Sequence, residues 1–190
     1  SKLQRVFKFL RYTKDRAMRF IKNVSEPDLV AYVDAGYGIH QEGESRSGLV
    51  VTLNGTPVLW KTAKQSIVTK SSTEAELVAL SDGCSDILWA RQMLMDQGYK
   101  LDATTVGEDN MSVLSMLERR KFSTARTKHI NIRYFFIVDR IKSGELKMVH
   151  VPTDLMVADF MTKPLTGKQF NVLQDRLFGP SKPSARDQVA

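Results

Sequence analysis

The sequence predicts an α/β fold in which a mixed five-stranded sheet is flanked by helices. Three observations predict it: β-rich runs separated by turn residues over 29–61, a long amphipathic helix pattern over 71–98, and two later β-rich runs at 104–109 and 146–151 bordered by helical patterns. The long helix makes a parallel crossover possible, because parallel strands need a connection of that length.

The first three strands are expected to form an antiparallel meander. The run 29–34 is a buried first strand with Asp34 at its carboxyl end. Asn54-Gly55 separates the next two runs, and this dipeptide supplies the positive φ angles of a tight hairpin turn.

Helical spacing predicts the remaining elements. The long helix begins at Ser71-Ser72-Thr73-Glu74, a sequence typical of an N-terminal cap. Shorter helical patterns cover Asn110–Leu117, Ile130–Ile141, the region around Leu155–Met161, and Phe170–Phe178.

The chain divides into three parts. Residues 1–27 contain a short basic amphipathic helix, expected to be a connector that packs against a neighbouring domain, with binding to a membrane surface as the less common alternative. Residues 28–179 form the main domain. Residues 180–190 are rich in Pro, Ser and charge, which predicts a disordered tail.

Composition narrows the class of protein. With 190 residues and 42% hydrophobic content, the chain can bury a core. Its formal net charge of +7 favours polyanionic partners. No apolar run approaches the roughly 20 residues that cross a bilayer, so no membrane partner is expected. Cys84 is the sole cysteine, which excludes an internal disulfide and a cysteine zinc cluster.

Four carboxylates are candidate metal ligands. Asp34 and Asp109 end strands that, as parallel neighbours, would bring both side chains to one edge of the sheet. Glu76 would approach this edge from one face and Asp159 from the other. Crowded carboxylates raise one another's pKa, and divalent cations relieve the repulsion. Two Mg²⁺ ions about 4 Å apart could then support in-line phosphodiester displacement.

Each carboxylate also has a purely structural interpretation. Asp34 and Asp109 could be strand-end turn residues, with Asp109 capping the next helix. Glu76 could be the capping-box partner of Thr73. Asp159 could be a solvated helix residue. Spacing does not decide between these alternatives.

Three blocks resemble a known family. They are Lys64-Gln65-Ser66-Ile67-Val68 with Ser71-Ser72-Thr73-Glu74-Ala75-Glu76-Leu77, then Arg126-Thr127-Lys128-His129-Ile130-Asn131-Ile132-Arg133-Tyr134, then Val151-Pro152-Thr153 through Ala158-Asp159-Phe160-Met161-Thr162-Lys163-Pro164-Leu165. They are similar to the ribonuclease H domain of copia-type LTR retrotransposon polyproteins. The resemblance runs from about Leu3 to about Gly179, in the expected order.

That resemblance implies the ribonuclease H-like fold, with sheet order 3-2-1-4-5, and two Mg²⁺ ions, with Mn²⁺ as an alternative. It implies endonucleolytic cleavage of the RNA strand of RNA/DNA hybrids during reverse transcription, leaving 3′-OH and 5′-phosphate ends. It also implies a reverse transcriptase domain upstream in the same polyprotein, and a location in cytoplasmic virus-like particles or in the nucleus.

The family's catalytic acids map onto Asp34, Glu76, Asp109 and Asp159. Glu74 is the alternative to Glu76 as the second catalytic acid, and the Glu76-Leu77-Val78-Ala79 stretch favours Glu76. Two departures remove no predicted ligand. Ala35-Gly36-Tyr37-Gly38 stands where relatives often carry Asp-Trp, and Gly107-Glu108 replaces a bulkier strand end.

Further residues are candidates for substrate contact. His129 and His150 are possible auxiliary groups, although a structural part is the favoured interpretation of both. Asn110 lies beside the metal strand, and basic residues would contact phosphates. The predicted nucleic-acid-binding set is Lys61, Lys64, Lys70, Asn110, Arg119, Arg120, Lys121, Arg126, Lys128 and Arg133.

Two other classes of function remain open. A non-catalytic domain could pack beside a polymerase and hold nucleic acid, but the presence of all four carboxylates argues against it. A DNA-cutting integrase or transposase of the same superfamily fold is disfavoured by the block 71–76 and the block 158–165.

Overall fold

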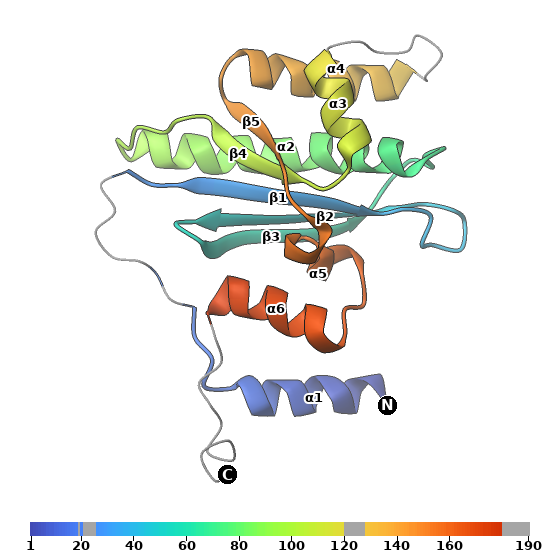
Figure 1. Ribbon diagram of the computed structural model, residues 1–190, viewed down its shortest axis with the longest axis vertical. Coiled ribbons are helices and arrows are strands. Elements are labelled where there is room, and N and C mark those ends of the chain that lie inside the picture. Colours follow the sequence, from blue (N-terminus) through green and yellow to red (C-terminus); the bar gives the residue numbers. More distant parts are fainter. Residues whose placement is uncertain (19, 21–25, 120–127, 180–190) are drawn as a thin grey trace.

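The structure is a computed structural model that describes residues 1–18, 20, 26–119 and 128–179. Within these residues, the sheet has the order β3-β2-β1-β4-β5. β1 pairs antiparallel with β2, and β2 with β3, whereas β4 pairs parallel with both β1 and β5 (Figure 1). The predicted fold and strand order are therefore confirmed. The strands are β1 Leu29–Gly36, β2 Arg46–Leu53, β3 Thr56–Lys64, β4 Thr104–Glu108 and β5 Leu146–His150.

The predicted hairpin and long helix are present. Asn54 and Gly55 have φ angles of 52° and 79° and connect β2 to β3, as the Asn-Gly signal predicted. Helix α2 (Ser72–Asp96) begins after its N-cap Ser71, whose side chain accepts a hydrogen bond from the Glu74 N–H. α2 supplies the crossover from the antiparallel strands to β4.

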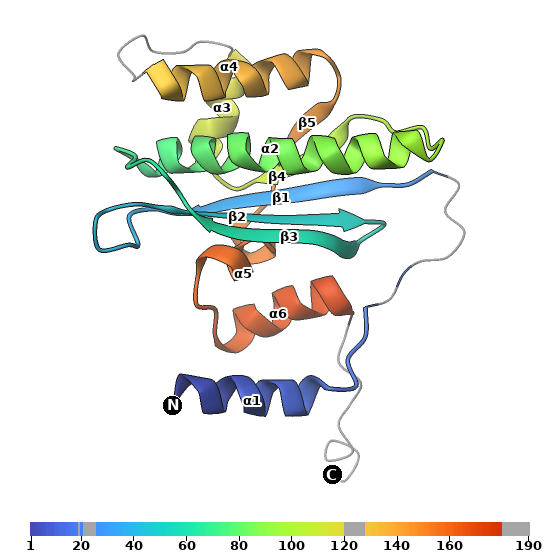
Figure 2. The same cartoon turned by 180° about the vertical axis from the view of Figure 1, so that it is seen from behind.

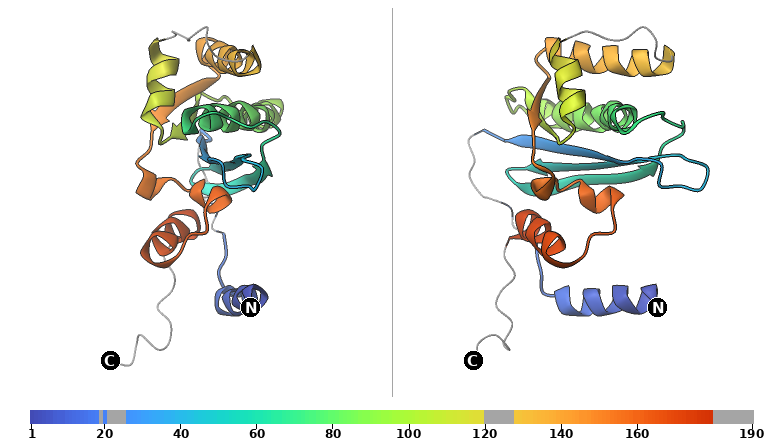
Figure 3. Two further views of the ribbon diagram at one scale, coloured as in Figure 1. Left: turned by 90° about the vertical axis from the view of Figure 1, so that its right-hand side faces the viewer. Right: turned by 45° about the vertical axis from the view of Figure 1, so that its right-hand side comes forward.

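Helices cover both faces of the sheet (Figures 1 and 2). On one side lie α2, α3 (Met111–Arg119) and α4 (Lys128–Lys142). On the other side lie α5 (Asp159–Thr162), α6 (Gly167–Phe178) and, outermost, α1 (Lys2–Thr13), as Figure 3 also shows. No helix in the described part of the chain is long and apolar enough to span a bilayer.

The helix predicted around Leu155–Met161 is wrong in its bounds. A 3-10 turn, η1 (Thr153–Leu155), comes first, and α5 begins only at Asp159. Met156 has extended backbone, with φ −75° and ψ 94°, which interrupts the helix. Met156 and the two residues that follow it are fully buried, so the chain uses this non-helical turn to place apolar side chains in the interior.

The main core lies between the sheet and α2. Alternate residues of β1 (Leu29, Ala31 and Val33) face α2 in this cluster. Tyr32 instead packs with Val157 and its neighbours on the α5 and α6 side. Because side chains alternate along a strand, Asp34 faces the same side as Tyr32. The end of β1 thus directs its carboxylate toward α5.

The contact between β2 and α5 depends on the absence of a side chain at Gly48. A Cβ at this position would lie 2.7 Å from Met161 Cβ, 2.7 Å from Thr162 Cγ2 and 3.0 Å from the Ala158 carbonyl oxygen. We expect Gly48→Ala to lower the free energy of unfolding by about 1–3 kcal/mol, because overpacking must displace α5. Urea denaturation measures the change.

Gly83 in α2 provides the matched control. A Cβ there would meet Leu49 Cδ1 at 3.5 Å, an ordinary contact. Gly83→Ala should leave the free energy of unfolding unchanged or raise it, since alanine favours helix. Equal stabilities for the Gly48 and Gly83 variants would contradict the close approach of α5.

Candidate metal centre

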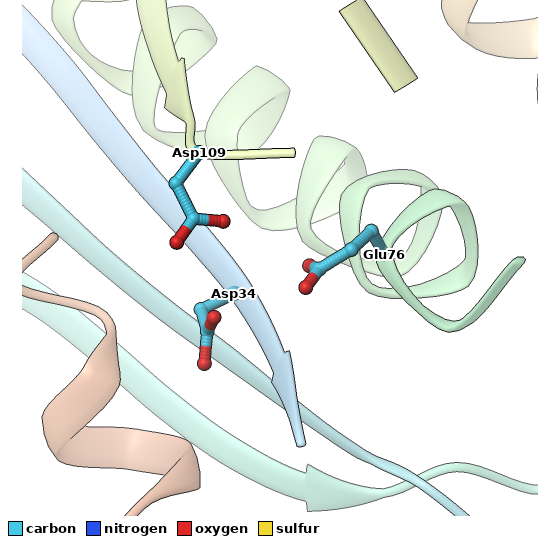
Figure 4. Close-up of side chains that lie close together, drawn as sticks. All are labelled: Asp34, Glu76 and Asp109. Atoms are coloured by element: carbon cyan, nitrogen blue, oxygen red, sulfur yellow. The ribbon is translucent and has the colours of Figure 1, made fainter. Parts of the chain in front are cut away.

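Three carboxylates from separate elements converge at one edge of the sheet. Asp34 lies near the end of β1, Glu76 in the second turn of α2, and Asp109 directly after β4. One oxygen from each lies within 4.8 Å of the others, and Figure 4 shows the three side chains pointing toward a common space. The parallel pairing of β1 and β4 accounts for the meeting of Asp34 and Asp109.

The structure places Glu76, and not the alternative Glu74, among the candidate metal ligands. Glu76 is 6% exposed and belongs to the cluster. The Glu74 carboxylate instead accepts a hydrogen bond of 2.9 Å from the Lys70 N–H, beside the start of α2. Ser71, rather than Thr73, is the N-cap, so Glu76 is free of the capping-box interaction considered for it.

Asp159 approaches Asp34 from the opposite face of the sheet. It begins α5 and is fully buried. The Lys163 ammonium joins the two carboxylates, at 2.7 Å from Asp159 Oδ1 and 3.1 Å from Asp34 Oδ1. The Thr162 hydroxyl donates to Asp34 Oδ2, and the Gln169 amide donates to Asp159 Oδ2 at 3.3 Å. The segment 159–163 therefore supplies both a carboxylate and the hydrogen bonds that position Asp34.

Glu108 is a further carboxylate beside the site that sequence analysis did not identify. It is fully buried, and its Oε1 accepts a 3.0 Å hydrogen bond from the Asn110 N–H. Its charge acts on Glu76 more strongly than that of Asp34 or Asp109. The signal in the sequence was the departure at Gly107-Glu108, but a single acidic residue at a strand end does not reveal which face it occupies.

The electrostatics of the cluster disfavour full ionisation. Burial, then the nearby charge of Glu108, raises the pKa of Glu76 to about 10. Burial raises the pKa of Glu108 to about 8, and it raises that of Asp159 to about 6 against the opposing hydrogen bond from Lys163. Burial would lower the pKa of Lys163, but the hydrogen bond to Asp159 and the charge of Asp34 raise it, so the ammonium stays charged.

These residues fit a divalent cation. Hard cations such as Mg²⁺ prefer oxygen ligands, and the cluster offers carboxylate oxygens alone. Among the described residues, Glu76 Oε2 and Glu108 Oε2 are buried with no hydrogen-bond partner. Burying an unpaired carboxylate oxygen costs free energy, and a cation bound at the cluster would reduce that cost.

Most of the predicted basic contacts are surface residues, and several are ion-paired. Lys61 lies 2.8 Å from Asp86, and Lys64 lies 2.7 Å from Glu44. Arg133 pairs with Asp82. Lys70, Arg119 and Lys128 are exposed. Arg120, Lys121 and Arg126 lie outside the described residues.

The remaining candidates lie outside the three-carboxylate cluster. The Asn110 side chain accepts hydrogen bonds from the Ser112 and Val113 N–H groups at 3.0 and 3.3 Å, which makes it a cap of α3. His129 is exposed in the first turn of α4, and His150 is exposed at the end of β5. Neither histidine belongs to the cluster.

Solved structures share this fold. The ribonuclease H1 LC11, isolated from compost by a metagenomic approach, matches with a TM-score of 0.55 and 19% identity over 71% of this chain and 92% of that chain. The structure of LC11 ribonuclease H1 in complex with an RNA/DNA hybrid matches with a TM-score of 0.53 and 19% identity over 71% of this chain and 94% of that chain. The architecture is therefore that of a ribonuclease H-like domain.

Sequence relatives of the chain include retrotransposon polyproteins. No family model matches the chain. It is 35% identical to the retrovirus-related Pol polyprotein from transposon RE2 of Arabidopsis thaliana, and 34% identical to that from transposon RE1 of the same plant. Each match covers 88% of this chain but 12% of the polyprotein, so the chain spans a small part of these relatives. The chain is thus similar to one segment of retrovirus-related Pol polyproteins, and it has the ribonuclease H-like fold.

Proposed function

We propose that the chain is an endoribonuclease that cleaves the RNA strand of RNA/DNA hybrids during retrotransposon reverse transcription. The convergence of Asp34, Glu76 and Asp109 at the edge of a ribonuclease H-like sheet carries this proposal. The similarity to an enzyme solved with an RNA/DNA hybrid supports the substrate class, and the Pol relatives support the biological setting.

The four predicted acids would share the binding of two cations. Asp34, Glu76 and Asp109 would bind the first cation. The second cation would lie between Asp34 and Asp159. Two bound Mg²⁺ or Mn²⁺ ions supply an activated water and a charge that stabilises the leaving 3′ oxygen. The chain's own part is to hold the carboxylates together: β1 and β4 fix two of them, and the Thr162 hydroxyl orients Asp34. The expected products carry 3′-OH and 5′-phosphate ends.

The substrate would be held mainly through its phosphates. Lys70, Arg119 and Lys128 are exposed cations available for such contacts, whereas Lys61, Lys64 and Arg133 would first have to exchange an acidic partner for a phosphate. Phosphate contacts give affinity that falls with salt and does not depend on sequence.

The exposed apolar side chains of α1 fit a helix that packs against a neighbouring domain of a polyprotein. Phe9 packs edge-on against Phe170 of α6 at 5.8 Å, yet Leu3, Val6 and Phe7 remain 62%, 53% and 63% exposed. We assign residues 1–27 as a connector to an upstream reverse transcriptase domain and residues 28–179 as the nuclease domain. The disordered tail predicted for 180–190 lies outside the described residues. The assembled polyprotein would act in cytoplasmic virus-like particles or in the nucleus.

Cleavage of labelled substrates tests the proposal. The chain is incubated with an RNA/DNA hybrid, duplex DNA and duplex RNA, each with Mg²⁺, Mn²⁺ or EDTA. We expect cutting of the hybrid's RNA strand alone, abolished by EDTA. Equal cutting of duplex DNA would instead indicate an integrase or transposase activity, and hybrid binding without cutting by folded protein would indicate a non-catalytic domain.

A further inference from the structure

Lys163 places a fixed positive charge inside the proposed metal centre. Its ammonium bridges Asp34 and Asp159, which have side chains only 1% exposed, while the Lys163 side chain itself is 39% exposed. The lysine follows α5 directly as its C-cap residue. The ammonium thus contacts the two buried carboxylates while part of the lysine side chain remains in solvent.

The hydrogen bonds divide the centre into two unequal halves. Both oxygens of Asp34 accept hydrogen bonds, from Lys163 and Thr162, and both oxygens of Asp159 accept them, from Lys163 and Gln169. In contrast, Glu76 Oε2 is buried without a partner in the described part of the chain. The half at Glu76 has unused acceptor capacity, whereas the half between Asp34 and Asp159 already contains a cation.

We infer that the Lys163 ammonium holds the place of the second divalent cation, so that a metal ion binds between Asp34 and Asp159 only when this ammonium withdraws. The inference rests on the proposed function, because it concerns the second of the two proposed metal positions. Asp34 can still serve the first cation, since each carboxylate oxygen has two lone pairs. The first cation therefore has the unpartnered Glu76 Oε2 available among the described residues, whereas the second binds against the lysine.

The alternative interpretation, that Lys163 forms only a structural ion pair, predicts a different result. Lys163 and Asp159 are four residues apart, a spacing at which helical residues often pair. Such a pair would stabilise α5 whether or not metal is present, and its ammonium would stay on the two carboxylates when metal binds. Metal affinity together with the accessibility of the Lys163 amine when metal is bound, rather than stability or activity, therefore distinguishes the two interpretations.

Titration with Mn²⁺, followed by the electron paramagnetic resonance signal of the free ion, measures this affinity. In Lys163→Met we expect the dissociation constant of the second Mn²⁺ to fall by about tenfold or more, because a unit positive charge next to the binding position is removed. Lys163→Arg keeps the charge and should resemble the wild type. Lys168→Met removes an exposed lysine of α6 and is the matched control, also expected to resemble the wild type.

Wild-type protein provides a second measurement that needs no variant. Acylation of lysines by an activated ester, mapped by mass spectrometry, reports the accessibility of each amine. Saturating Mg²⁺ should increase the acylation of Lys163 severalfold and leave that of Lys168 unchanged. Constant or decreased acylation of Lys163 in Mg²⁺ would overturn the inference.

The outcomes separate this inference from the function on which it rests. If the wild-type chain binds Mn²⁺ and Lys163→Met binds the second ion no more tightly than Lys168→Met, only the inference about the Lys163 ammonium is overturned. If the wild-type chain binds no Mn²⁺, or binds it equally well after Asp109→Asn, the proposed metal centre is overturned as well.

Discussion

Asp109→Asn is expected to reduce cleavage of an RNA/DNA hybrid by at least about a thousandfold while leaving the fold intact. The amide keeps the shape of the carboxylate but removes the charge that a divalent cation requires. One oxygen of Asp109 lies within 4.8 Å of an oxygen of Asp34 and of Glu76, so removing this negative charge relieves repulsion and should not unfold the chain. Single-turnover rates at saturating Mg²⁺ measure the loss, and far-ultraviolet circular dichroism checks the fold.

Asp154→Asn is the matched control for this prediction. Asp154 is an exposed aspartate in the 3-10 turn next to Thr153, whose hydroxyl donates to Asp109 Oδ2 at 2.8 Å. Its substitution should leave the rate within about twofold of the wild type, because solvent screens the charge of an exposed side chain outside the cluster. A folded Asp109→Asn variant with wild-type turnover would remove Asp109 from the site.

The metal-free protein is expected to lose stability as the pH rises from about 5 to about 8. The pKa values of Glu108 and Glu76 are raised from 4.5 to about 8 and about 10 in the folded chain, mainly by burial. Over this interval the folded protein retains protons that the unfolded chain has released. Stability is therefore highest below the unfolded pKa and is lost as the pH rises toward the folded values. Each group contributes up to about 1.4 kcal/mol per pH unit.

Denaturation by urea in EDTA, repeated across this pH range, measures the slope. Glu108→Gln removes one titrating group in the same shape, so its slope should be shallower than that of the wild type. Saturating Mg²⁺ should also flatten the slope, because the cation compensates the charge that protons otherwise neutralise. Identical slopes for the wild type and Glu108→Gln would show that Glu108 is already ionised in the folded chain.

Much of the fold could be predicted because its signals are local. The Asn54-Gly55 turn fixes the hairpin through backbone conformation, and the spacing of apolar residues fixes the long helix. The helix predicted around Leu155–Met161 failed for the opposite reason. Its apolar residues are buried by tertiary packing in a non-helical turn, and a periodicity argument cannot distinguish these two forms of burial.

The candidate site was predictable only in part. Asp34 and Asp109 come together because parallel neighbouring strands end at one edge, a relation that follows from strand order. Glu76 could be preferred over Glu74 only through family resemblance, and the geometry agrees with that choice. The burial of Glu108 and the bridge made by Lys163 depend on how β4 and α5 pack, which no spacing along the chain specifies.

The most direct test of the central claim, that Asp34, Glu76 and Asp109 bind a divalent cation, is anomalous diffraction at the manganese edge. Crystals of the chain grown with Mn²⁺ should show an anomalous peak about 2.0–2.3 Å from one oxygen of each carboxylate, the range typical of small divalent cations with oxygen ligands. A well-ordered crystal with the same fold and no peak between these three side chains would contradict the account.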